Sequence, residues 1–195
     1  MKSKKITKIR ENISEVEFQK LLTYLRGKDN INPNTKENLR RTFILLYYTG
    51  MRVNEVKQLK IKDIVSILEN LELIIITHKT KKERKLFFSK EAIKEIRKGF
   101  VFDENSKKND YIIKAKGNPT KTPSTVTFIT QVNSFIQEVL GHRFSSHSFR
   151  AGLITDMSKS INPKFIKEFI GHSDITTTMR YIKPSDEDLK ECLVR

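Results

Sequence analysis

Four short segments of the sequence carry side chains that together could bind and react with a phosphate group. They are TGMRVNEV at 49–56, HKTKKER at 78–84, HSFRAG at 147–152 and GHSDITTTMRY at 171–181. Their arginines, lysines, histidines and tyrosine donate hydrogen bonds, which anionic oxygens accept. Each segment also has an ordinary structural interpretation, such as a helix cap or a solvated surface. The chemistry therefore depends on whether the fold brings the segments together.

The spacing within these segments favours anion binding. Arg52 follows a glycine turn at the start of a predicted helix, where backbone N–H groups and a guanidinium can converge on one phosphate. His147 and Arg150 are three residues apart, so in a helix they share a face and can address a single anion. His172 directly follows Gly171 at a predicted turn. Tyr181 comes later, across a short predicted helix.

The composition indicates a basic protein that binds an acidic partner. The chain has 195 residues, which fits one domain better than two, and 38 Lys and Arg against 23 Asp and Glu give a net charge of +15. Such a charge attracts polyanions, with nucleic acid as the first candidate. RNA, a membrane surface and a merely solvated basic surface stay open on composition alone.

The cysteine content and the hydropathy of the sequence limit the kinds of site and the cellular location that we expect. Cys192 is the single cysteine, which excludes an internal disulfide framework and a cysteine zinc cluster within one chain. No apolar run approaches the roughly 18–20 residues of a membrane span, and the basic start has no apolar stretch behind it. We expect a cytoplasmic, nucleoid-associated protein without membrane contact.

The expected fold class is mixed α+β, mainly helical with a small antiparallel sheet. Ser14 and Glu17 form a capping box at the start of the first helix, and Gly50 should end the second. The composition of 64–88 predicts the sheet, whose second and third strands are joined by the lysine hairpin 78–84. A brief strand is expected at 111–113. Further helices are expected at 53–59, 89–100, 124–140, 147–158, 163–170 and 175–181.

Taken in order, the four segments resemble the tyrosine recombinase (phage integrase) family. The match includes Thr49, Gly50, Arg52 and Glu55 of the TGxRxxE pattern, a hairpin lysine, the HxxR pair, and a GH turn followed by the tyrosine. It covers the chain from about 14 to 182. The resemblance implies the family's catalytic-domain fold over 14–183, a basic tail or linker at 1–13 and a C-terminal tail at 184–195.

The resemblance also implies strand cleavage and rejoining of double-stranded DNA without metal or nucleotide cofactor. Tyr181 would attack a backbone phosphate, releasing a 5'-hydroxyl and leaving a 3'-phosphotyrosyl bond that another 5'-hydroxyl resolves. Because free tyrosine has a pKa near 10, the phenol needs cationic neighbours. Arg52 and Arg150 would clamp the non-bridging oxygens, since planar guanidiniums give paired donors.

The other matching residues receive supporting roles. His147 would act in proton transfer and phosphate contact, and His172 would donate a hydrogen bond to the phosphate. Lys79 would protonate the leaving 5'-oxygen as general acid, with Lys81 as the fallback because both lie in the hairpin. Glu55 would orient Arg52 rather than react.

Two departures from the family pattern concern the ends. Family members usually carry a helical domain ahead of the catalytic one, whereas about 13 residues precede the first helix here, so we expect either a fragment or a short natural form. In relatives a C-terminal segment docks onto a neighbouring protomer; the apolar residues Leu189, Cys192, Leu193 and Val194 could serve this, or form a frayed tail. We expect a monomer in solution that assembles as a dimer or tetramer on DNA.

Three other functions stay open. An inactive or regulatory DNA-binding relative would be expected to lack a catalytic residue, and none is missing. A metal-dependent nuclease would use Asp63 with the Glu83-Arg84-Lys85 segment. A type IB topoisomerase has similar chemistry, although the GH turn favours a recombinase. The target site cannot be read from one sequence, because it depends on groove contacts and DNA deformability.

Overall fold

The computed structural model describes residues 11–76, 83–116, 118–182 and 190. Its elements are α1 (Glu15–Gly27), α2 (Pro33–Thr49), α3 (Val53–Gln58), α4 (Ile61–Asn70), β1 (Glu72–Ile76), β2 (Glu83–Phe87), α5 (Lys90–Gly99), α6 (Thr125–Leu140), α7 (Ser146–Ser158), α8 (Pro163–Ile170) and α9 (Ile175–Met179). The predictions for Lys79 and Lys81, and for most of both terminal segments, lie outside these residues.

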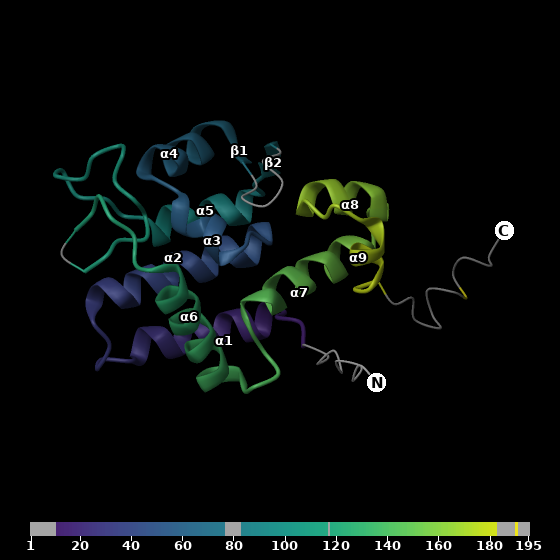
Figure 1. Ribbon diagram of the computed structural model, residues 1–195, viewed down its shortest axis with the longest axis horizontal. Helices are drawn as coiled ribbons and strands as arrows, with labels where there is room; N and C mark the ends of the chain where they lie inside the picture. Colours follow the sequence, from purple (N-terminus) through teal and green to yellow (C-terminus); the bar gives the residue numbers. More distant parts are fainter. Residues whose placement is uncertain (1–10, 77–82, 117, 183–189, 191–195) are drawn as a thin grey trace, which may run out of the picture.

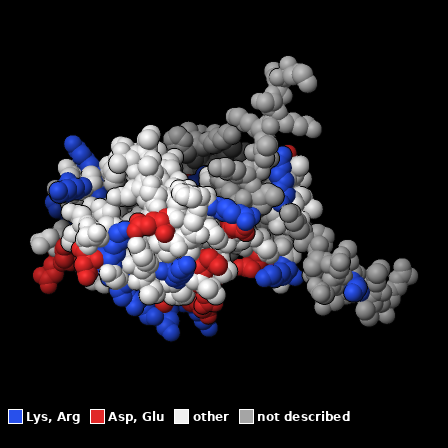
Figure 2. Space-filling model, turned by 90° about the horizontal axis from the view of Figure 1, so that it is seen from below, with Lys and Arg blue, Asp and Glu red and all other residues white. Residues whose placement is uncertain are grey.

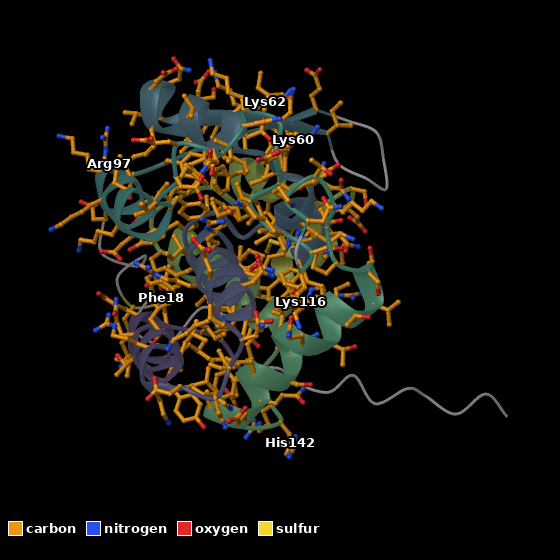
Figure 3. All side chains as sticks on the ribbon, turned by 90° about the vertical axis from the view of Figure 1, so that its left-hand side faces the viewer. Phe18, Lys60, Lys62, Arg97, Lys116 and His142 are labelled. Carbon is orange, nitrogen blue, oxygen red and sulfur yellow. The ribbon has the colours of Figure 1, made fainter. Side chains whose placement is uncertain are left out.

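Helix α2 is the central element, and α1, α3, α5 and α7 all pack against it (Figure 1). Its sequence is apolar around most of its circumference, so Leu39, Phe43 and Leu46 are fully buried. Phe18 of α1 packs inside this layer, stacked on Tyr47 with ring centroids 4.1 Å apart (Figure 3). By contrast, three cationic side chains labelled in that view are exposed: Lys62, Arg97 and Lys116.

The predicted fold class is confirmed, but the sheet is smaller than expected. Residues 64–70 belong to helix α4 and not to a strand, because Ile61, Ile64 and Ile67 recur at helical spacing and are buried. Asp63 caps that helix by accepting from the backbone N–H of Lys60 at 2.8 Å. The described sheet therefore has two strands rather than three. The expected strand at 111–113 amounts to one isolated bridge between Tyr111 and Lys60.

The two strands pair antiparallel, with Leu73 opposite Leu86 and Ile75 opposite Arg84. Alternate residues of β2 are buried, as expected for a strand covered on one face. Because of that alternation, Arg84 points inward with 4% of its surface exposed. The polar stretch that we assigned to the hairpin tip thus ends in a buried arginine, which belongs to the strand.

Two hydrophobic clusters meet along α7. The larger contains Phe43, Phe149 and most buried residues of α1 to α6. The smaller consists of Ile154, Ile166 and Ile170, with Tyr181 packed partly against it. Figure 1 shows α8 and α9 as a separate layer beside the hairpin, joined to the rest through α7. Near the seam between the clusters, residues of three of the four sequence segments converge with Arg84 of the fourth.

Within the described ranges, none of the helices is both long and apolar enough to cross a membrane. The face shown in Figure 2 carries acidic and basic side chains interspersed around an uncharged area.

Gly152 permits the close contact between α7 and the chain that precedes α1. A Cβ at this position would lie 2.3 Å from the carbonyl oxygen of Ile13, which is itself buried and donates its N–H to Ser148. Gly152→Ala should therefore lower the free energy of unfolding by about 1–3 kcal/mol, the usual cost of overpacking. Denaturant titration would measure this. Gly27→Ala is the control: nothing lies near its Cβ, so stability should be unchanged or rise by up to ~1 kcal/mol. An equal loss in both variants would contradict this assignment.

Candidate active site

The first predicted arginine is positioned by a glycine turn and a glutamate. Gly50 ends α2 in the left-handed conformation (φ +59°). Arg52 then caps α3: its backbone N–H donates to Glu55 Oε2 at 2.8 Å, and its Nη1 donates to Glu55 Oε1 at 3.0 Å. The Arg52 side chain is 41% exposed while Glu55 is buried. Glu55 thus orients Arg52 and leaves part of its guanidinium open.

Sequence reasoning missed the second partner of Glu55. Arg84 of β2 donates from Nη2 to Glu55 Oε2 at 3.0 Å, and from Nη1 to the carbonyl oxygen of Ile170. Burial lowers the pKa of Arg84, while the nearby Glu55 raises it. In a strand Arg84 lies on the same face as Leu86, two residues later, so a strand that buries Leu86 also turns Arg84 toward the core. We missed this because Arg84 had been assigned to the polar stretch 78–84 at the tip of the hairpin.

Arg150 lies on α7 beneath Arg52, with 4% of its surface exposed. It donates from Nη1 to the carbonyl oxygen of Gly50 at 2.8 Å and from Nη2 to that of Ile170 at 2.5 Å. Its Nε donates to His172 Nε2 at 3.4 Å. Burial, then the charges of Arg52 and Arg84, lower the pKa of Arg150 to about 9, so the group stays charged at neutral pH. Since a guanidinium has five N–H donors, two stay available to a bound anion.

The bonding of His172 determines its tautomer. Because arginine can only donate, His172 Nε2 must accept the hydrogen bond from Arg150. The proton therefore resides on Nδ1, which lies 2.9 Å from Oγ1 of the buried Thr178. Burial and the three nearby arginines lower the pKa of His172 to about 4, the largest cause being burial. In this state His172 is neutral and supports Arg150.

Tyr181 lies beside His172, just after α9. The two rings are stacked with centroids 6.3 Å apart and planes 18° apart. Asp174 caps α9 by accepting from the N–H of Thr176 at 2.9 Å, and Gly171 ends α8 in the left-handed conformation. These two caps set the turn that carries both His172 and Tyr181 toward Arg150. Tyr181 is half-buried against the smaller hydrophobic cluster.

His147 opens onto the same site from the first turn of α7. It is exposed, and with Arg52 and Arg150 it lines a pocket of about 150 Å³, whose other walls come from α3 and α6. The expectation that His147 and Arg150 address one anion is consistent with this shared lining. Arg52, His147, Arg150, His172 and Tyr181 are all brought to one region, whereas Lys79 and Lys81 lie outside the described residues.

The charges of this region do not cancel. Arg52, Arg84 and Arg150 interact with one another electrostatically, and Glu55 is the carboxylate that faces them. Among the described residues, three guanidiniums and one carboxylate leave an excess of two positive charges, one of which is on the partly exposed Arg52. Burying unpaired charge is costly. The arrangement thus suits an anion bound at the pocket that Arg52 and Arg150 line, in the same region as His172 and Tyr181.

Two of the residues considered for a metal nuclease have other partners. Asp63 caps α4, and Lys85 forms an ion pair with Glu72 on the neighbouring strand. Over the part of the chain that the structure describes, no group of three or more His, Cys, Asp or Glu side chains could hold a metal ion.

Comparison with known proteins gives a consistent set of relatives. The model of the phage integrase family matches residues 11–188. Tyrosine recombinase XerA of Pyrococcus horikoshii is 26% identical over 99% of this chain and 64% of its own length. Tyrosine recombinase XerD of Rhizobium meliloti is 31% identical over 75% of this chain and 47% of its own. The chain thus spans less than two thirds of these relatives.

Solved structures share the fold. A crystal structure of XerA recombinase matches with a TM-score of 0.66 at 20% identity, over 98% of this chain and 65% of that one. XerH recombinase bound to difH substrate matches with a TM-score of 0.67 at 21% identity, over 95% and 53%. The catalytic domain of bacteriophage HP1 integrase matches at 0.54 and 20% identity, over 95% of both chains.

The depressed pKa of His172 makes stability depend on pH. In the unfolded chain His172 takes up a proton near its ordinary pKa of 6.5, whereas in the folded protein its pKa is about 4. The protein should therefore lose stability as pH falls from about 6.5 to 4, by ~1–2 kcal/mol for this half-buried group once solvent screening is allowed for. Thermal or urea unfolding across this range would measure the loss.

The comparison that isolates His172 uses His172→Gln, since an amide can accept from Arg150 without titrating. This variant should lose less stability on acidification than the wild type. His142→Gln, at the exposed end beyond α6 (Figure 3), should behave as the wild type. Equal acid sensitivity in all three proteins would exclude His172 as the source.

Proposed function

This chain belongs to the phage integrase family, and we propose that it is the catalytic domain of a site-specific tyrosine recombinase acting on double-stranded DNA. The observation that carries the proposal is the uncompensated arginine group beside Tyr181, linked through His172. A backbone phosphate diester supplies the missing negative charge. Two relatives that match most of this chain are named tyrosine recombinases, and the structure of XerH was solved with its difH substrate bound.

In the proposed reaction, the Tyr181 oxygen attacks a backbone phosphorus while the bond to the 5'-oxygen breaks. Arg52 and the two available N–H groups of Arg150 hold the non-bridging oxygens, whose charge grows in the transition state. His147 takes part in transfer of the phenolic proton, and a hairpin lysine, Lys79, gives the 5'-oxygen its proton. Attack by another 5'-hydroxyl reverses these steps and rejoins the strand.

His172 receives a more specific role than the resemblance implied. In the free protein its Nε2 accepts from Arg150, so the ring holds Arg150 in place. Donation from Nε2 to a phosphate requires that this hydrogen bond be released and that Nε2 carry a proton. We assign His172 first to orienting Arg150, and to phosphate contact only in the DNA complex.

The cellular setting follows from the same proposal. We propose that the protein is a monomer in solution, assembles as a dimer or tetramer on DNA, and is found in the cytoplasm with the nucleoid. Because phosphate contacts dominate affinity, binding should weaken steeply with salt. The direction of the biological reaction, integration, excision or dimer resolution, depends on DNA sites and accessory proteins.

The central test is a covalent adduct. A crossover site obtained by selecting bound DNA would be built into a nicked suicide duplex and incubated with the protein in EDTA. We expect a covalent protein–DNA band on a denaturing gel. Tyr181→Phe should reduce it by at least about 1,000-fold, because the nucleophile is removed, while DNA binding is kept. Absence of an adduct from wild-type protein that binds this DNA would favour the inactive relative; supercoil relaxation without strand exchange would favour the topoisomerase.

The hairpin lysine can be assigned with a modified leaving group. Lys79→Ala should slow adduct formation by about 10²–10⁴-fold, the usual contribution of a general acid. Replacing the bridging 5'-oxygen by sulfur should restore the rate, because a thiolate leaves without being protonated. Lys81→Ala is the matched control and should cleave both substrates at near wild-type rates. The opposite pattern would move the assignment to Lys81.

A further inference from the structure

Arg84 lies outside the set of five predicted site residues, yet it contacts the partners of two of them. Its guanidinium bridges a carboxylate on α3 and a backbone carbonyl at the end of α8, two elements far apart in the chain. Both acceptors are shared with other arginines. Glu55 also binds Arg52, and the carbonyl oxygen of Ile170 also accepts from Arg150 at 2.5 Å. Arg84 therefore contacts the partners of both phosphate-binding arginines.

Arg84 itself cannot reach a substrate. It is 4% exposed, and the turn at Gly171 closes over its side chain, since a Cβ there would lie 2.9 Å from Arg84 Cδ. Its Nη1 and Nη2 each donate one hydrogen bond, and its buried Nε has no hydrogen-bond partner among the described residues. A group with this environment can act on the reaction only through its neighbours.

Arg84 can affect the site through Glu55 and through the turn at 170–172, because both must be held in place to position the phosphate-binding arginines. Glu55 can hold Arg52 in one orientation only if the carboxylate is itself fixed, and Arg84 fixes Oε2 from the opposite side. The carbonyl of Ile170 lies two residues before His172, so the bond from Arg84 also anchors the turn that presents His172 to Arg150. Transition-state stabilisation by charged donors depends strongly on such fixed geometry.

We propose that Arg84 is a positioning residue that aligns the two phosphate-binding arginines by holding Glu55 and the 170–172 turn together. This inference rests on the proposed function for its consequence in catalysis, while its prediction for anion binding stands independently. The bridging needs the forked guanidinium, because the two acceptors lie on different elements and one ammonium cannot replace two nitrogens on a planar group.

Arg41 provides a matched control within the same chain. It is also a buried arginine whose guanidinium binds one carboxylate, that of Glu37, and backbone carbonyls, including that of Ile112. Its Nε likewise has no hydrogen-bond partner within the described ranges. It lies on α2 and serves the 101–112 loop rather than the pocket. Arg41→Met should thus reproduce the general loss of a buried arginine without affecting the site.

The experiment compares Arg84→Met, Arg84→Lys and Arg41→Met at a temperature well below their melting points. Inorganic phosphate would be titrated while the ring signals of His172 are followed by NMR, which requires no cleavage. We expect about ten-fold weaker phosphate binding in both Arg84 variants and less than a two-fold change in Arg41→Met. Covalent adduct formation should fall about 10–100-fold in the Arg84 variants, with sulfur or oxygen as the leaving atom.

Several results would overturn the inference. Unchanged phosphate affinity in Arg84→Met would show that the pocket does not depend on it. Full recovery in Arg84→Lys would mean that charge alone matters, and recovery with the sulfur leaving group would place its effect on the general acid. If the wild type binds phosphate but forms no adduct, the proposed function fails while the positioning role is still decided by the titration.

A second variant guards against misfolding of Arg84→Met. Glu55→Gln leaves one acceptor oxygen where the carboxylate has two, so the side chain can no longer hold Arg52 and Arg84 together. If positioning is what matters, phosphate binding should weaken even though a negative charge has been removed. Combined with Arg84→Lys, Glu55→Gln should cause little further loss, because both changes disrupt one coupled unit. Additive losses in this double-mutant cycle would show that the two residues act separately and would contradict the proposal.

Discussion

The carboxylate of Glu55 is shared by two arginines, and the geometry of the site depends on that sharing. One oxygen faces the guanidinium of Arg52 and the other that of Arg84, each at 3.0 Å. With Arg150 nearby, this one carboxylate cannot balance the three guanidiniums that the described part of the chain places here. Since a buried charge without a partner is costly, the protein keeps this group stable by opening Arg52 to solvent and by giving Arg150 backbone acceptors. The remaining imbalance is what makes the pocket suited to a phosphate.

Glu55 accepts hydrogen bonds from Arg52 and Arg84, whereas Arg150 donates to backbone carbonyls. The packing of the helices determines where these carbonyls lie. Gly50 and Ile170 offer their oxygens to Arg150 from opposite sides of the seam between the two hydrophobic clusters. Gly50 can approach so closely because it has no side chain: a Cβ there would lie 2.9 Å from Ile170 Cδ1. A change in how α8 packs on α7 would therefore shift the acceptors of Arg150. The smaller cluster is thus part of the active-site architecture even though its residues are apolar.

Much of this arrangement could be predicted from local signals in the sequence. Helix ends followed from caps that act within one turn, such as Ser14 with Glu17 and Gly50 at the end of α2. The pocket residues were identified through resemblance, and their convergence needed the tertiary structure. Residues 64–70 were wrongly assigned to a strand because β-branched composition was weighted above helical spacing. Arg84 was missed since its importance lies in contacts 29 and 86 residues away in sequence, which no local pattern reports.

The state of His172 follows from the same shortage of negative charge. Burial and, after it, three arginines hold the imidazole neutral, and neutrality is what allows Nε2 to accept from Arg150. A bound phosphate would add negative charge at the pocket and so favour protonation of the ring. Once both nitrogens carry protons, Nε2 can no longer accept from Arg150 and becomes a donor instead. Arrival of the anion would then free an N–H of Arg150 and create a new donor at His172, both available to the phosphate. In the free protein, the hydrogen bond from Arg150 to His172 thus stabilises the cationic pocket, and a bound phosphate would replace it.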